Sequence, residues 1–226
     1  MSHFLSVLPD DFAPTVFDNT SGLSSWGMML NDRLGDCTIA GPGHMVQAWT
    51  AAAGKEVTIP DSAILQAYED FDGYVDGDET TDNGGDILTV CEDWKAKGIG
   101  GHFITAHAEV NMTQMRWQQA LYVFGSLNAG IWLPVTAQAQ TGGTWDIVGD
   151  GKTGDSAPAS WGGHCVAVVG YDLEGITLVT WGELQRATWR FVMWYFDETH
   201  ACLSPEWTKS PIPLDQLNEA LAQIET

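Results

Sequence analysis

The spacing of apolar side chains changes along the chain, from a helical period in the first half to a strand period in the second. Segments with helical spacing are predicted at about 38–53, 61–71, 86–97, 112–124 and, at the end of the chain, 214–224. Short β-branched or aromatic runs between turn residues predict strands at 126–135, 165–171, 176–181 and 188–196. Four helices followed by a group of strands predict an α+β fold with two lobes.

The length and composition allow one domain with a substantial core. The chain has 226 residues, of which 44% are hydrophobic. We predict a single domain over 1–226, with a helix-rich lobe at about 20–105 and a β-rich lobe at about 106–226. A polar, glycine-rich stretch at 136–163 is predicted to be a loop.

Acidic residues greatly outnumber basic ones, and the net charge is −21. Such a chain repels phosphate backbones, so we expect no nucleic-acid partner. A solvated acidic surface is the simplest interpretation, although a halophilic or acidic environment would also fit. No apolar run is long enough for a membrane span, and the N-terminus lacks the pattern of a signal peptide. We therefore expect no membrane association and a cytoplasmic location.

One of the four cysteines stands where a reactive thiol is favoured. Cys37 begins the first predicted helix, where backbone N–H groups and the helix dipole favour a thiolate and can also hold an oxyanion. The amide of Asn31, six residues earlier, could be a second oxyanion donor. We interpret Cys91, Cys165 and Cys202 as small buried residues, because no two of the four form a CxxC pair.

A histidine at the start of a strand could act as the base for this thiol. His164 follows a glycine pair in Trp-Gly-Gly-His and leads into an apolar run that ends at Gly-Tyr171. The next predicted strand would pair with this one as a hairpin. A polar residue on it could then orient the imidazole, which is the third role in a catalytic triad.

These motifs, taken in order, resemble papain-like cysteine peptidases over most of the chain. Five segments of the sequence resemble this family: Leu8-Pro-Asp-Asp-Phe12, Asn31 to Cys37, Asp82-Asn-Gly-Gly85, the Gly-His164 motif and Trp181-Gly182. The chain also looks similar to uncharacterised phage and bacterial proteins, and a phage-encoded protein could be virion-associated.

The resemblance implies a papain-like two-lobed cysteine-peptidase fold, with a helical lobe and an antiparallel β lobe, acting on a peptide or protein substrate. It assigns Cys37 as nucleophile and His164 as base, with Asn31 as an oxyanion donor. It places Thr180 as the residue that orients His164. The substrate-binding residues that it implies are Asn83, Gly84, Gly85 and Trp181.

Several positions depart from the pattern of this family. Asn31 stands in place of glutamine, and Thr180 in place of the asparagine that orients the histidine. Asp36 should raise the pKa of the neighbouring thiol. Pro42 should kink the helix or delay its start. No pro-segment is evident.

Three functions remain open at this point. The first is a cysteine hydrolase that cleaves peptide or amide bonds, which should have a Cys37 thiol pKa well below that of free cysteine. The second is an inactive papain-like scaffold that binds assembly partners, for example in a phage virion. The third is amidase or transpeptidase chemistry on cell-wall peptides.

No cofactor or metal site is predicted. The spacing of His3, His102, His107 and His200 matches no metal-ligand pattern. Acidic loops at 70–86 and 146–155 could attract calcium, but they lack EF-hand spacing and are interpreted as solvated. We assign His44 a core or capping role.

Overall fold

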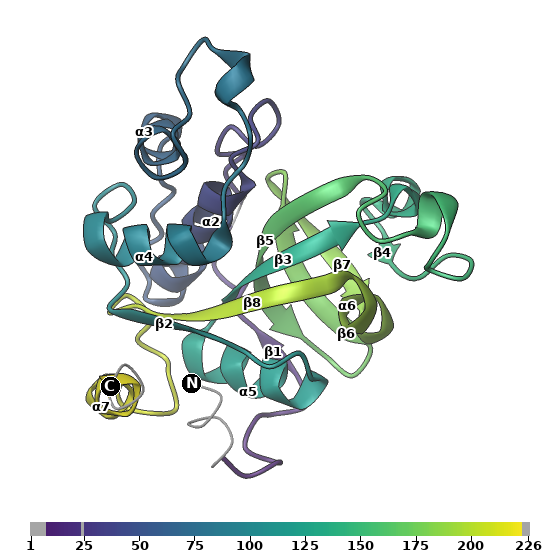
Figure 1. Cartoon of the computed structure of the whole chain (residues 1–226). Helices are drawn as coiled ribbons and strands as arrows, with labels where there is room; N and C mark the ends of the chain where they lie inside the picture. Colours follow the sequence, from purple (N-terminus) through teal and green to yellow (C-terminus); the bar gives the residue numbers. More distant parts are fainter. Residues whose placement is uncertain (1–7, 24, 223–226) are drawn as a thin grey trace.

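A single, mostly antiparallel sheet runs through the computed structural model, which describes residues 8–23 and 25–222 (Figure 1). Its main path is β2-β8-β3-β5-β6-β7-β4, and β1 pairs with β5. The strands are β1 Phe17–Asp18, β2 Ala106–Glu109, β3 Leu127–Leu133, β4 Thr144–Trp145, β5 Gly162–Tyr171, β6 Gly175–Thr180, β7 Glu183–Thr188 and β8 Phe196–Leu203. Only β4 and β7 pair in parallel among these described strands.

Helices cover both faces of this sheet. The α-helices are α2 Cys37–Ala52, α3 Asp61–Asp72, α4 Ile87–Lys97, α5 Gln114–Phe124, α6 Trp189–Tyr195 and α7 Leu214–Ala222, and the 3-10 turns are η1 Glu79–Thr81, η2 Val135–Gln140 and η3 Gly154–Ser156. Helices α2, α3 and α4 gather on one side of the molecule, whereas α5 and α6 contribute to a separate cluster of buried side chains (Figure 1). The predicted α+β class is therefore confirmed, while the division into lobes near residue 105 stays a prediction.

Local signals explain where several helices begin and end. Asp86 caps α4 by accepting a 2.8 Å hydrogen bond from the N–H of Thr89. Helix α5 ends at Gly125, whose φ of 77° favours glycine and where a Cβ would lie 2.6 Å from the Trp207 ring. Asp61 is the first residue of α3 and not its cap, because Pro60 occupies the cap position.

The strand predicted at 188–196 is wrong, because most of this segment is helix α6. The side chain of Thr188 caps the helix by accepting a hydrogen bond from the N–H of Phe191. Trp189, Val192 and Tyr195 are then buried at helical spacing. Aromatic and β-branched composition suggested a strand, but the cap and the three-residue spacing decided the local structure.

Other parts of the sheet were not predicted. Strands β1, β2, β7 and β8 were not expected, and the predicted loop at 136–163 contains η2, β4 and η3.

His3 and the end of the predicted tail helix at Ile224 lie outside the described residues. Within the described part of the chain, no helix combines the length and apolar character needed to cross a bilayer.

Strand β5 separates two hydrophobic clusters. Val166 and Val168 point into the cluster beneath α5 and α6, whereas Cys165, Ala167 and Val169 point into the cluster beneath α2, α3 and α4. This alternation is the two-residue period of a strand that is buried on both faces. The strand that carries His164 at its beginning is therefore held by both clusters.

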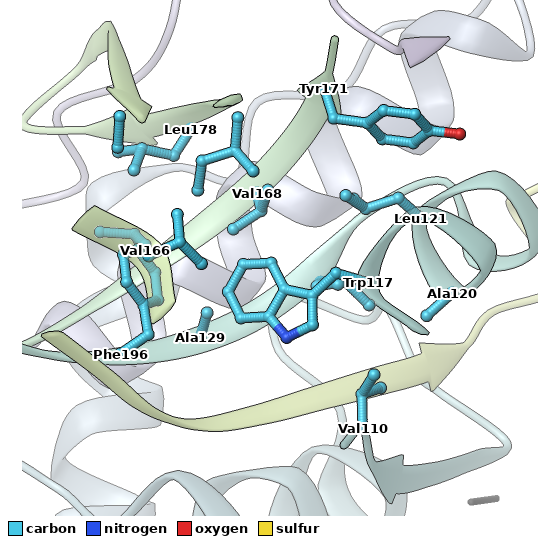
Figure 2. Close-up of a cluster of buried hydrophobic side chains, with 14 of the residues drawn as sticks. Val110, Trp117, Ala120, Leu121, Ala129, Val166, Val168, Tyr171, Leu178 and Phe196 are labelled. Atoms are coloured by element: carbon cyan, nitrogen blue, oxygen red, sulfur yellow. The ribbon is translucent and has the colours of Figure 1, made fainter. Parts of the chain in front are cut away.

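The indole of Trp117 lies in the middle of the cluster beneath α5 (Figure 2). It is fully buried among side chains that include Ala129 of β3 and Val168 of β5. A change of volume at this position should therefore be transmitted to the central strands.

We expect Trp117→Ala to lower the free energy of unfolding by about 3–5 kcal/mol, because it leaves a large cavity in a closely packed cluster. Urea unfolding followed by circular dichroism measures the change. Leu173→Ala, at a side chain that is 73% exposed, is the control and should have almost no effect. Equal effects of the two substitutions would contradict the packing described here.

Candidate active site

A cleft of about 690 Å³ brings most of the predicted site residues together. It lies between the start of α2, the 82–87 segment, and strands β3 and β5. The predicted residues that line it are Asn31, Cys37, Asn83, Gly84, Gly85, His164 and Trp181. Thr180 does not line the cleft; it is buried, and its hydroxyl is hydrogen-bonded to His164.

Cys37 is the first residue of α2, so Pro42 does not delay the helix. The main-chain carbonyl of Asp36 accepts hydrogen bonds from the N–H groups of Ile39 and Ala40. The backbone N–H groups of Cys37, Thr38 and Cys165 interact with the thiol. The sulfur therefore lies at a helix N-terminus among donors that can stabilise negative charge.

The surroundings of the sulfur nevertheless favour the thiol over the thiolate. Burial raises the pKa of Cys37 to about 11, and the nearby Asp36 carboxyl adds to this effect, against the three backbone N–H groups. The expected low thiol pKa is thus not found in the free protein. Moreover, no hydrogen bond joins the Cys37 sulfur and the His164 ring among the described residues.

His164 is held by one hydrogen bond and one stacking contact. Its Nε2 lies 2.7 Å from Oγ1 of Thr180. The indole of Trp181 stacks on the imidazole, with 4.8 Å between ring centroids and 12° between planes. Burial lowers the pKa of His164 to about 4, with a smaller contribution from His44, so the ring is neutral near pH 7.

Trp181 is placed by the turn that joins β6 to β7. Trp181 and Gly182 both have positive φ, of 48° and 72°, and Thr180 pairs with Glu183 across them. Two consecutive residues with positive φ form the type of two-residue turn that suits a twisted hairpin. The turn thus holds an indole over the imidazole of His164.

His44 supports the site from inside the helical cluster. It is almost fully buried, and its Nε2 lies 2.7 Å from the carbonyl oxygen of Gly27. Burial lowers the pKa of His44 to about 4, so this ring is also neutral near pH 7. The predicted core role of His44 agrees with this position.

Asn31 and Asp36 interact beside the nucleophile. Nδ2 of Asn31 donates a 3.1 Å hydrogen bond to Oδ1 of Asp36, while Oδ2 of Asp36 has no partner among the described residues. Burial raises the pKa of Asp36 to about 7. An amide nitrogen carries two hydrogens, so Asn31 retains a second N–H for a group in the cleft.

A network that sequence reasoning missed fixes the opposite wall of the cleft. Asp82 accepts hydrogen bonds from the hydroxyl of Tyr68, at 2.7 Å, and from the N–H of Gly35, at 2.9 Å. The N–H of Gly84 donates to the Tyr68 hydroxyl. At Gly85, a Cβ would lie only 2.3 Å from the carboxylate of Asp72. The segment 82–85 is therefore tied to the loop that precedes Cys37.

The comparisons with solved structures identify this arrangement as a papain-like fold. Xylellain, a cysteine protease from Xylella fastidiosa, matches with a TM-score of 0.65 and 12% identity, over 90% of this chain and 89% of xylellain. The Carica candamarcensis cysteine protease CMS1MS2, solved in complex with E-64, matches with a TM-score of 0.59 and 15% identity, over 84% of this chain and 99% of that one. No protein-family model and no curated protein matches the chain.

The comparisons confirm the predicted resemblance at the level of the fold. Both neighbours are papain-like cysteine proteases, and both align over most of their length. The suggested closeness to phage and bacterial proteins remains a prediction.

The buried carboxyl of Asp36 should make stability depend on pH. Its folded pKa of about 7 lies above the usual aspartate pKa of 3.8, so the folded protein binds more protons between these values. Stability should therefore fall as pH rises from 4 through 7. Asp72, whose pKa burial raises to about 6, acts in the same direction.

We expect Asp36→Asn to raise the free energy of unfolding at pH 8 by roughly 2–4 kcal/mol and to change it little at pH 4. Thermal and urea unfolding at the two pH values measure the difference. Asp32→Asn, at an exposed neighbouring position, is the control. An unchanged pH dependence in Asp36→Asn would show that this carboxyl ionises normally.

Proposed function

We propose that this protein is a cysteine hydrolase that cleaves peptide or amide bonds, with Cys37 as nucleophile and His164 as general base. The observation that carries the proposal is the position of His164, which shares one cleft with Cys37 while Thr180 binds its Nε2 and Trp181 covers its face. This combination orients one ring nitrogen and leaves Nδ1 for proton transfer.

In the proposed mechanism the pair is neutral at rest. Nε2–H of His164 donates to the Thr180 hydroxyl, and Nδ1 accepts the thiol proton as the Cys37 sulfur attacks the substrate carbonyl carbon. The carbonyl oxygen becomes an oxyanion, which the backbone N–H of Cys37 and the free N–H of Asn31 stabilise. A neutral pair fits a raised thiol pKa and a lowered imidazole pKa.

The second half of the reaction returns the enzyme to its starting state. His164 donates its proton to the leaving amine as the carbon–nitrogen bond breaks, and an acyl-thioester remains on Cys37. His164 then takes a proton from water, whose oxygen attacks the thioester carbonyl. The acid is released, and the sulfur recovers its proton from His164.

The walls of the cleft suggest a preference for basic peptides. Four acidic residues line it, and no lysine or arginine does among the described residues; the four are Asp82, Asp86, Asp197 and Glu198. An extended peptide would lie along the backbone of Gly84 and Gly85, with a cationic side chain toward these carboxylates. The exposed indole of Trp132 adds apolar surface on the β3 side.

The catalytic assignment is tested with a library of fluorogenic peptides. Cys37→Ala should abolish turnover, and His164→Ala should lower kcat/KM by about 10²–10⁴-fold. Thr180→Val should reduce kcat, whereas Thr180→Ser, which keeps the hydroxyl, should restore most of it. The acid limb of kcat/KM should fall near pH 4, where His164 becomes protonated. Activity that survives in Cys37→Ala would overturn the assignment.

The substrate preference is tested with peptides that differ at a single position. We expect an Arg or Lys peptide to be cleaved at least about tenfold faster than its Glu counterpart, with the ratio falling as salt is raised. Asp197→Asn should reduce the ratio. His102→Gln, at a residue outside the cleft, should leave it unchanged. Equal rates for both peptides would remove the electrostatic basis of the preference.

Two observations favour a second candidate, an inactive scaffold that binds a protein partner. The thiol pKa of about 11 and the absence of a hydrogen bond from the sulfur to His164, among the described residues, are compatible with a dormant site. Iodoacetamide labelling of Cys37 at pH 7, read by peptide mass spectrometry, separates the two. A hydrolase should be labelled more slowly in His164→Ala, whereas a scaffold should be labelled equally slowly with and without His164.

The class of substrate that the protein cleaves would distinguish a general peptide hydrolase from an enzyme that acts on cell-wall peptides. Purified muropeptides and an unstructured protein can be offered to the same preparation, with E-64 as a probe because the Carica candamarcensis neighbour was solved in complex with it. Cleavage of muropeptides alone would favour an amidase. Cleavage of neither substrate, with no adduct at Cys37, would favour the scaffold.

A further inference from the structure

Three potential metal ligands that are distant in the sequence meet on the side of the sheet covered by α4. Cys91 of α4, His107 of β2 and His200 of β8 each offer one ligand atom, and these atoms all lie within 4.8 Å of one another. Strands β2 and β8 are antiparallel neighbours, with His107 opposite Cys202. His200 and Cys202 are two residues apart on β8 and therefore point to the same face.

Both imidazoles are arranged as metal-ligating histidines commonly are. Nε2 of His107 lies 3.1 Å from a carboxylate oxygen of Glu92, and Nε2 of His200 lies 2.7 Å from one of Glu198. Each Nδ1 is buried and has no hydrogen-bond partner among the described residues. The two side chains are only 8% and 5% exposed. A carboxylate on one nitrogen fixes the tautomer that leaves the lone pair on the other.

We propose that Cys91, His107 and His200 bind a divalent transition-metal ion of the zinc type, and that Cys202 is the fourth ligand. Cys202 is a buried free thiol that interacts with Cys91 through a hydrogen bond. Two thiolates and two neutral imidazoles form a donor set that tetrahedral zinc prefers. Ligand atoms around such an ion lie about 3.3–3.8 Å apart, so the atoms of Cys91, His107 and His200, now within 4.8 Å of one another, and Cys202 beside Cys91 would have to draw together when the metal binds.

The site is structural and does not involve Cys37 or His164, although Glu198 both holds His200 and lines the cleft. All four ligands come from the protein, and Cys91 and Cys202 are almost completely buried, so no position remains open for a substrate. The ion would join α4, which follows the 82–85 wall of the cleft, to strands β2 and β8. Each cysteine loses its proton when the metal binds, so loading would release protons and stabilise the folded chain.

The proposal is tested on the full chain, stripped of metal under reducing conditions and then titrated with Zn²⁺ or Co²⁺. We expect one ion per chain by elemental analysis after gel filtration, a higher melting temperature, and a Co²⁺ spectrum with tetrahedral d–d bands and thiolate-to-metal charge transfer. Cys91→Ser and His200→Gln should lose these signals. Glu92→Gln, at a 63% exposed side chain that does not threaten the fold, should weaken Zn²⁺ binding by about 10–100-fold.

Two controls separate this site from other histidine and cysteine positions. His102→Gln removes an imidazole that also pairs with a carboxylate, that of Glu206, but lies outside the cluster, and it should bind Zn²⁺ as the wild type does. Cys37→Ala should also bind normally, so failure of the hydrolase assignment would not affect this result. Absence of stoichiometric zinc, no thiolate charge transfer with Co²⁺, or loss of binding in Cys37→Ala but not in Cys91→Ser would overturn the proposal.

Discussion

The burial of β5 on both faces is the constraint on which the rest of the structure depends. Val166 and Val168 anchor the strand in one hydrophobic cluster, and Ala167 and Val169 anchor it in the other. Strands β3 and β6 pair along its edges and satisfy its backbone groups. The packing of both clusters therefore fixes the position of His164, which lies near the start of β5. Helix α2 packs on the same strand and places Cys37 near His164.

The sequence predicted helices better than strands, for a physical reason. Helices α3, α4 and α5 have apolar faces with helical spacing, and Gly73, Gly98 and Gly125 mark their ends, whereas α2 is buried on every side. Strand β8, with the sequence FDETHACL, has no apolar alternation at its start, so only its pairing with β2 and β3 makes it a strand. Helix α6 was mistaken for a strand because its residue types favour strands while its cap and spacing favour a helix.

Short motifs predicted most residues of the candidate site, but the pKa shifts and the contacts between residues distant in the sequence could not be derived from them. Local motifs pointed to Cys37 and His164, and the family resemblance added Thr180; in the fold Cys37 and His164 line one cleft, and Thr180 lies behind His164. The raised thiol pKa depends on burial, which only the fold supplies. In the same way, the meeting of Cys91, His107 and His200 depends on three elements converging, and no local spacing encodes it.

The hairpin turn at Trp181 and Gly182 has a consequence for how the cleft exchanges solvent. The indole over His164 belongs to a tight two-residue turn with positive φ at both positions, and not to a long loop. Access of water to the imidazole is thus set by the position of this ring, which also contacts the rings of Trp145 and Trp161. A substrate reaches the base along the cleft between the start of α2 and strand β3, while a smaller pocket beside Trp161 lies on the other side of the indole.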